Sequence, residues 1–145
     1  MTDMASPAVM RAWARIVRTK QRLQDAVERD LKHEGLPPLE WYDVLLELSR
    51  APEGRLALKD IEREMLLAQY NLSRLIDRLE AKGLVRRLEF PGDRRRQLIE
   101  ITAEGRTLRE RMWPVYAASL QRHVGARITE AEAEAIFNLL GKFAS

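Results

Sequence analysis

The sequence predicts a mainly helical fold that contains one β-hairpin, and three observations support this prediction. Apolar residues recur at three- and four-residue steps over most of the chain, which is the period of an amphipathic helix. Between residues 84 and 101 the spacing changes to partial alternation, which is typical of strands. The 145 residues are 46% hydrophobic and 32% charged, which suits one domain with an appendage and excludes a largely disordered chain.

The first predicted helix is long and begins at a clear N-terminal signal. Ser6 is a favoured N-cap, and Pro7 fits the first helical position because its missing N–H would be unpaired there. An apolar stripe continues from Val9 to Leu31, and Gly35 provides a C-cap. A helix of about 25 residues is about 38 Å long. We therefore expect this helix to have a partner along its length.

Three shorter helices follow. The second is predicted from Leu39 to Ser49, and the third lies around Ile61. The fourth starts near Gln69 and ends at Gly83, after a basic last turn. Ala68 stands where a serine or aspartate cap would be expected, so the usual polar cap of this helix is missing.

The hairpin and two more helices complete the chain. Residues 84–90 and 97–101 are the predicted strands, and residues 91–93 (Pro-Gly-Asp) form a turn signal between them, followed by an arginine-rich tip. Thr102 can cap a fifth helix, in which Pro114 should bend or break the helical path. Thr129 and Glu132 form the pattern of a capping box for the last helix.

The composition excludes several classes of protein. The chain has no cysteine, which removes disulfide scaffolds, thiol catalysis and cysteine-ligated metals. His33 and His123 lie far apart in the sequence, so neither a metal site nor a cofactor is expected. No apolar run approaches the length of a membrane span and residues 1–10 do not resemble a signal peptide, so we expect a cytoplasmic protein with no membrane partner.

The positive charge is concentrated in one segment. The formal net charge is +3, and residues 86–96 hold five arginines against two acidic residues, so this segment carries the whole excess. Such a concentration is suited to a polyanion such as nucleic acid, although a solvated loop would also explain the charge run.

Two short helices followed by a basic hairpin predict a winged helix-turn-helix, and hence an interface for double-stranded DNA. In this fold the fourth helix can enter a major groove, and the hairpin, the wing, can follow the adjacent minor groove. The exposed face of the fourth helix and its entrance carry Gln69, Tyr70, Asn71, Ser73, Arg74 and Arg78. The wing tip carries Arg94, Arg95 and Arg96. Each set alone could be ordinary solvated surface, but the two in consecutive elements favour DNA binding.

Residues 75–87, 93–95 and 101–105 resemble the multiple-antibiotic-resistance regulator (MarR) family of transcription factors. The wing pattern of that family is Asp-x-Arg, five further residues, Leu or Ile, and then Thr. Asp93, Arg95, Ile101 and Thr102 match it. The resemblance implies that Asp93 and Arg95 hold the shape of the wing through a salt bridge. It also implies that Arg74 and its neighbours contact DNA.

The resemblance further implies a homodimer that acts on a pseudo-palindromic operator, with repression as the expected outcome. Residues 1–36 and 103–145 would form a helical dimerisation region, and residues 37–102 the winged DNA-binding domain. Relatives release DNA when a small, often anionic aromatic or phenolic molecule binds between the two regions. The candidate effector-binding residues are Trp13, Arg15, Trp41, Tyr42 and Trp113. Each of them could equally be a core or interface residue.

The sequence supports two other functions less well than DNA binding. An enzyme is disfavoured because the chain has no phosphate-binding glycine loop, nucleophile elbow or His-Glu metal motif, so we expect no catalytic residues. The alternative is a winged-helix module that contacts protein or RNA without binding an operator. An apolar exposed face on the fourth helix would favour that alternative.

Overall fold

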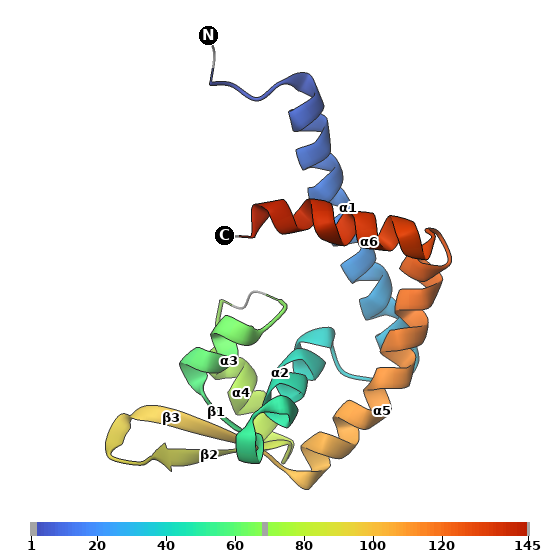
Figure 1. Ribbon diagram of the computed structural model, residues 1–145. Helices are drawn as coiled ribbons and strands as arrows, with labels where there is room; N and C mark the ends of the chain where they lie inside the picture. The colour runs from blue at the N-terminus through green and yellow to red at the C-terminus, as the bar shows by residue number, and fades with distance from the viewer. Residues whose placement is uncertain (1–2, 68–69, 145) are drawn as a thin grey trace.

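The computed structural model describes residues 3–67 and 70–144, and the side chain of Arg94 lies outside the described set. Within these residues the chain forms six α-helices and a small three-stranded antiparallel sheet. Figure 1 shows the sheet at one end of the molecule, and the N-terminal half of the first helix with the last helix at the other. None of the described helices is long and apolar enough to cross a membrane.

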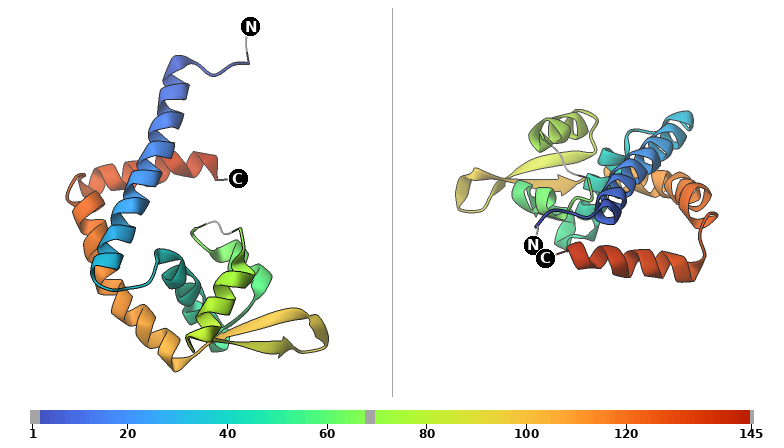
Figure 2. Two further views of the ribbon diagram at one scale, coloured as in Figure 1. Left: turned by 180° about the vertical axis from the view of Figure 1, so that it is seen from behind. Right: turned by 90° about the horizontal axis from the view of Figure 1, so that it is seen from above.

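The outer part of the molecule is built from three helices. α1 (Pro7–His33) packs along α5 (Ala103–Leu120), and α6 (Glu130–Leu140) follows after a π-helical turn at 121–125. The predicted caps of all three are confirmed: Ser6, Thr102 and Thr129 each accept a hydrogen bond from a first-turn backbone N–H, and Thr129 forms the full capping box with Glu132. Figure 2 shows that α6 crosses α1 in the left view and lies apart from it in the view from above.

Pro114 does not break α5. The helix continues through this residue to Leu120 without a break, although a proline inside a helix removes one backbone hydrogen bond. Pro114 lies on the exposed side of α5, while α1 and α2 pack against the helix. α5 ends at Leu120, and residues 121–125 follow it as a wider π-helical turn.

A half-buried aspartate joins the two long helices at the C-terminal end of α5. Asp30 of α1 accepts hydrogen bonds from the Ser119 hydroxyl (2.6 Å) and the Arg122 guanidinium (2.8 Å), and His123 Nε2 lies 2.9 Å from the same oxygen. The Ser119 hydrogen bond, together with His123 and Arg122, holds the pKa of the Asp30 carboxyl below its ordinary value. These contacts fix α1 against the turn that follows α5.

The winged part lies between these helices in the sequence. It contains α2 (Leu39–Arg50), α3 (Leu58–Glu64) and α4 (Leu72–Ala81), and its sheet has the order β1-β3-β2. β2 (Val85–Phe90) and β3 (Asp93–Ile101) form the predicted hairpin. β1 (Arg55–Ala57) was not predicted, because a strand of three residues after a turn is too short for alternation to be recognised.

Two cores hold the fold together. The first, which we call the winged core, is formed by fully or almost fully buried side chains of α2, α3, α4 and the sheet: Val44, Leu45, Leu48, Ile61, Leu72, Leu75, Ile76, Leu79, Leu84, Val85, Ile99 and Ile101. The second, the junction core, joins α1, α2 and α5 through Val27, Leu31, Leu36, Leu39, Tyr42 and Met112. The winged part is therefore fastened to the base of the long helices, and its wing points away from them.

Candidate nucleic-acid interface

The start of α4 differs from the prediction. The helix begins at Leu72, and its N-cap is Asn71, whose side-chain oxygen accepts a hydrogen bond from the backbone N–H of Arg74 (3.2 Å). The predicted start near Gln69 is therefore wrong, and so is the prediction that the polar cap is missing. Asparagine is one of the best capping residues, and it lies three positions later than the sequence pattern suggested. Asn71 thus has a structural role in addition to any contact with a ligand.

The two faces of α4 differ as the sequence predicted. Its inner face is buried in the winged core through Leu72, Leu75, Ile76 and Leu79. Its outer face exposes Ser73, Arg74 and Arg78, and Tyr70 is fully exposed just before the helix. Gln69 lies outside the described residues. Asp77 and Glu80 are exposed on the same helix. The outer side is therefore polar and carries charges of both signs, and a major groove could accept it.

The wing carries its arginines in a bulge. Glu89 pairs with Gln97, and the next pair is Phe90 with Asp93, so β3 has three more residues than β2 between these two pairs. The extra residues are Arg94, Arg95 and Arg96. They belong to β3 and not to the turn, which consists of Pro91 and Gly92, with Gly92 at φ +81°. A bulge redirects side chains out of the ladder, so here it presents a basic tip.

Two local contacts shape this tip. The Asp93 carboxylate accepts a hydrogen bond from the backbone N–H of Arg95 (2.9 Å). The predicted salt bridge between these two residues is not among the ion pairs of the described residues, and their contact runs through the backbone N–H of Arg95. The guanidinium of Arg96 stacks over the Phe90 ring, 4.2 Å from its centroid. The side chain of Arg94 is not described.

The other two arginines of the basic segment are bound within the protein. Arg86 and Arg55 both form ion pairs with Glu100, whose side chain is almost buried. Hydrogen bonds from Arg55 and Arg86 hold the pKa of Glu100 below its ordinary value. Arg87 binds side chains and a carbonyl group of α4. Of the five arginines in residues 86–96, Arg86 and Arg87 are therefore paired within the protein and are not available for a nucleic acid.

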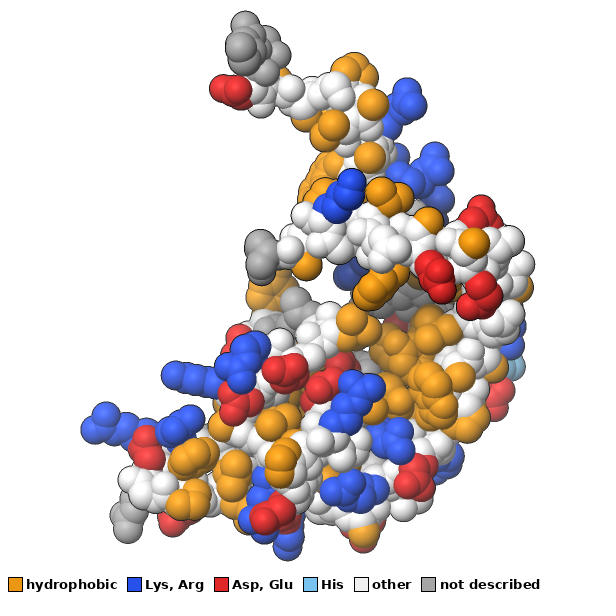
Figure 3. Space-filling view, in the orientation of Figure 1, with side chains coloured by type: hydrophobic (Ala, Val, Ile, Leu, Met, Phe, Trp, Pro, Cys, Tyr) orange, Lys and Arg blue, Asp and Glu red, His pale blue; other side chains and the backbone are white. Residues whose placement is uncertain are grey.

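The remaining cations face outward from two adjacent elements. Among the residues that the structure describes, the guanidinium groups of Arg74, Arg78 and Arg95 have no ion-pair partner. Figure 3 shows basic side chains projecting at the wing end of the molecule. Guanidinium groups without internal partners are available for phosphate oxygens and for the edges of bases.

A buried carboxylate fixes the connection between α3 and α4. Asp43 of α2 accepts hydrogen bonds from the backbone N–H groups of Leu66 (3.0 Å) and Leu67 (2.7 Å). Burial raises the pKa of the Asp43 carboxyl, and the two hydrogen bonds partly offset this effect. Sequence reasoning did not identify Asp43, because its partners lie 23 and 24 residues away and no local pattern marks them.

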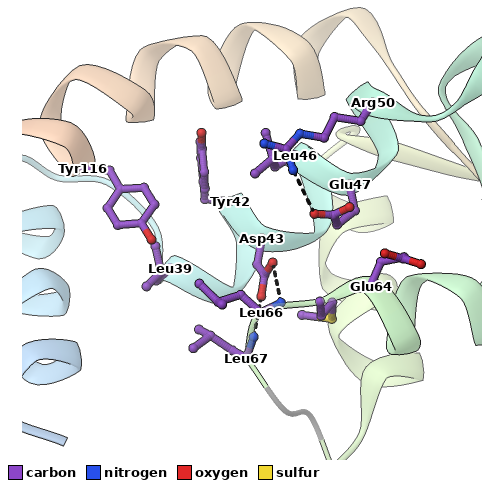
Figure 4. Close-up of a pocket in the computed structure, with 11 residues that line it drawn as sticks. Leu39, Tyr42, Asp43, Leu46, Glu47, Arg50, Glu64, Leu66, Leu67 and Tyr116 are labelled. Carbon is purple, nitrogen blue, oxygen red and sulfur yellow. Dashed lines mark hydrogen bonds and ion pairs between the residues drawn. The ribbon is translucent and has the colours of Figure 1, made fainter. Parts of the chain in front are cut away.

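A cavity of about 380 Å³ opens beside Asp43 (Figure 4). One side is apolar and aromatic, with Tyr42 and Tyr116 in edge contact at a centroid distance of 5.2 Å. The other side carries the carboxylates of Asp43, Glu47 and Glu64 and the guanidinium of Arg50. Burial raises the pKa of the Glu47 carboxyl, the positive charge of Arg50 opposes this effect, and the negative charges of Asp43 and Glu64 add to it.

Most of the residues predicted to bind an effector do not meet at this cavity. Tyr42 lines it, and Trp113 stacks on Tyr42 with a ring-centroid distance of 6.3 Å. Trp41 packs against the winged core, while Trp13 and Arg15 are exposed on the N-terminal half of α1. Tyr116 was missed. No group of three or more His, Cys, Asp or Glu side chains in the described part of the chain is arranged to hold a metal ion.

Comparisons with known proteins agree with this architecture. The family model described as "MarR family" matches residues 34–96. The regulator YkoM of Bacillus subtilis, an uncharacterised helix-turn-helix protein, is 30% identical over 94 residues, which are 65% of this chain and 59% of that protein. Less than two thirds of YkoM is therefore matched.

Two solved structures share the fold. Sco3205 of Streptomyces coelicolor, a MarR family regulator solved in complex with DNA, has a TM-score of 0.88 at 24% identity, covering 99% of this chain and 90% of that one. BpsR of Bordetella bronchiseptica, whose DNA binding is regulated by 6-hydroxynicotinic acid, has a TM-score of 0.80 at 27% identity, covering 93% and 99%. These relatives are regulators and not enzymes, as the sequence predicted. Residues 34–96 match the MarR family of winged helix-turn-helix transcriptional regulators, and the chain as a whole shares the fold of solved members of that family.

Proposed function

We propose that this regulator binds a specific site in double-stranded DNA, with α4 in the major groove and the wing along the adjacent minor groove. The observation that carries the proposal is the set of guanidinium groups without internal partners on α4 and on the β3 bulge. Arg74 would contact bases or backbone, with Tyr70, Asn71, Ser73 and Arg78 beside it. The proposed DNA contacts also include Gln69, which precedes Tyr70, and Arg94, Arg95 and Arg96 of the wing. The complex of Sco3205 with DNA supports this role by analogy.

The proposal includes a homodimer, formed by residues 1–36 and 103–145, around a winged domain of residues 37–102. Large apolar side chains are exposed on the N-terminal half of α1 and on the last helical segment: Val9, Met10, Trp13, Ile16, Val17, Ile136, Phe137, Leu139, Leu140 and Phe143. An apolar surface on this scale is expected at an interface. A second copy would also place two α4 helices on one pseudo-palindromic operator. We further propose that binding represses transcription.

The alternative, a module that contacts protein or RNA, predicts a different surface. A protein-binding α4 would expose apolar side chains, whereas the outer face of this helix presents Ser73, Arg74 and Arg78. This polar face, together with the guanidinium groups of Arg74 and Arg78, favours duplex DNA.

Selection of bound duplexes from a random pool at moderate salt tests the proposal. We expect a pseudo-palindromic consensus whose half-sites lie about one helical turn apart. Recovery of unrelated duplexes, both with the native protein and after refolding to remove a bound ligand, would contradict sequence-specific binding. A reporter under control of the selected site then gives the sign of regulation.

We also propose that the cavity beside Asp43 binds a small aromatic effector that releases DNA. Its aromatic wall suits a planar ring, and its three carboxylates outnumber the one guanidinium of Arg50. A cationic or neutral phenol is therefore favoured over an aromatic carboxylate.

Three probes of similar ring size separate these charge classes: tyramine, 4-ethylphenol and 3-(4-hydroxyphenyl)propionate. In calorimetric titration we expect tyramine to bind at least tenfold more tightly than the anion. Glu47→Gln should reduce this preference, and Glu62→Gln, which removes the same charge outside the cavity lining, should not. Equal or tighter binding of the anion would contradict the assignment.

A further inference from the structure

Arg87 of the wing contacts one face of α4 through both terminal nitrogens of its guanidinium. Its Nη2 donates to the backbone carbonyl of Ser73 (3.1 Å), and its Nη1 lies 2.7 Å from Asp77 Oδ1 and 3.0 Å from Glu80 Oε1. Its Nε donates to Gln97 Oε1 on the neighbouring strand (3.1 Å). The Arg87 backbone N–H also donates to Glu80 Oε2 (3.2 Å).

The α4 partners of Arg87 are spaced so that they lie on one side of the helix. Ser73, Asp77 and Glu80 are four and three residues apart, so they lie on one side of α4. Arg87 comes from β2 and its side chain is only 22% exposed. A single half-buried side chain therefore connects the wing to two turns of α4, from the first turn to the last.

The contact reaches the proposed reading surface directly. The Ser73 carbonyl belongs to the peptide unit that leads into Arg74, so Arg87 holds the backbone at the residue proposed to contact bases. Arg87 also balances the carboxylates of Asp77 and Glu80, which lie on the same helix as Arg74 and Arg78. Without it, these carboxylates would face the phosphates of a bound duplex without compensation.

We infer that Arg87 is a positioning residue that fixes the wing relative to α4, so that the arginines of both elements reach one duplex together. This inference rests on the proposed DNA binding. The wing is a hairpin that projects beyond the winged core (Figure 1), and an isolated two-stranded ribbon is only marginally stable. A fork-shaped, charge-assisted anchor gives it a defined orientation.

Arg87→Lys tests the geometry because it keeps the charge and removes the planar fork. The matched control is Arg86→Lys, the same change on the adjacent residue, whose partner is Glu100 and not α4. For the selected duplex we expect the Kd to rise about tenfold in Arg87→Lys and to stay within twofold in Arg86→Lys. Equal effects of the two changes would overturn the inference.

A double-mutant cycle separates positioning from general stability. Arg96→Ala should weaken binding severalfold in the native protein and by less than twofold when Arg87 is already lysine, because an unanchored wing no longer delivers Arg96 to the duplex. If Arg87 only stabilised the fold, the Arg96→Ala effect would be the same in both backgrounds. Additive effects would therefore overturn the inference.

A measurement without DNA makes the two proposals separable. The chain has no cysteine, so spin labels can be placed at Ala81→Cys on α4 and Glu89→Cys on the wing. We expect a narrow distribution of label distances with Arg87 and a clearly broader one in Arg87→Lys, with Arg86→Lys unchanged. An unchanged distribution would overturn the inference. If no duplex is selected, the DNA-binding proposal fails while the distance distribution still decides the role of Arg87.

Discussion

The helices of the winged part bury their apolar faces within the chain, whereas α6 and the N-terminal half of α1 leave theirs exposed. Ile61 and Leu75 are at most 1% exposed, while Trp13 is 67% exposed and Phe137 is 78% exposed. α6 has no buried residue at all among those the structure describes. The winged part thus buries its apolar faces within one chain, and we propose that the outer helices form half of an interface that a second chain completes.

The two regions also differ in their polar contacts. In the winged part, Asp43 connects α2 to the residues that follow α3. Arg87 connects the wing to α4. In the outer part, Asp30 joins α1 to the end of α5, and the exposed halves of α1 and α6 lie beyond that joint. The contacts that orient the proposed reading surface lie within one chain, whereas the spacing of two such surfaces would depend on the proposed dimer.

Breaking the outer interface should have the largest effect. Phe137→Glu places a charge in the proposed contact and removes a large apolar side chain, each of which costs about 1.5–3 kcal/mol or more per chain when buried. We expect the dimer dissociation constant to rise at least 100-fold by analytical ultracentrifugation. Glu134→Gln, on the same helix, should leave it unchanged. A Phe137→Glu variant that remains dimeric at micromolar concentration would show that α6 is not the interface.

Within the winged part, the largest expected change comes from Asp43. Asp43→Leu removes the carboxylate that accepts hydrogen bonds from the backbone N–H groups of Leu66 and Leu67, and we expect a loss of about 2–4 kcal/mol in the free energy of unfolding. Asp43→Asn keeps one acceptor oxygen and should lose less. Urea denaturation measures both. Equal stability of the leucine variant and the native protein would contradict the anchoring role.

A change on the reading surface should leave stability almost unaffected. Arg74→Ala should weaken binding to the selected duplex by about 1–3 kcal/mol and relax sequence preference, as fluorescence anisotropy with single-base variants would show. Lys142→Ala removes the same charge near the C-terminus and serves as the control. Unchanged affinity and preference in Arg74→Ala would remove this residue from the interface.

The smallest expected effect is a pH dependence at the joint of the outer helices. Because the pKa of Asp30 is lowered in the folded protein, its contribution to stability is present above the unfolded value of 3.8 and is lost as the pH falls through the lower, folded value. The difference in unfolding free energy between the native protein and Asp30→Asn should therefore shrink as the pH falls below 3.8. A difference that grows on acidification would contradict this assignment.

Local signals in the sequence were sufficient for most of the fold. The capping residues Ser6, Thr102 and Thr129 and the glycines at 83 and 92 act on neighbouring residues, so the pattern predicts them directly. The apolar stripe of the first helix was also predicted from the sequence. Its N-terminal part is exposed in the single chain, so the packing partner expected for it does not come from the described residues.

Contacts between distant segments could not be read in the same way. The sequence placed Arg87 in a basic run, but its partners lie on a helix 7 to 14 residues earlier and depend on how the hairpin packs. β1 forms because β3 offers it an edge, and Asn71 acts as the cap because the chain enters α4 later than the pattern indicated. The proposed effector cavity likewise combines α2, α5 and the segment after α3.

The mass of the complex with the selected duplex tests the central claim most directly. Light scattering coupled to size exclusion gives the number of chains per duplex, and the same duplex cut to one half-site gives the reference. The account predicts two chains on the full site and a much weaker complex with the half-site, because the outer helices hold two winged units together. One chain per duplex, bound equally well by both, would contradict it.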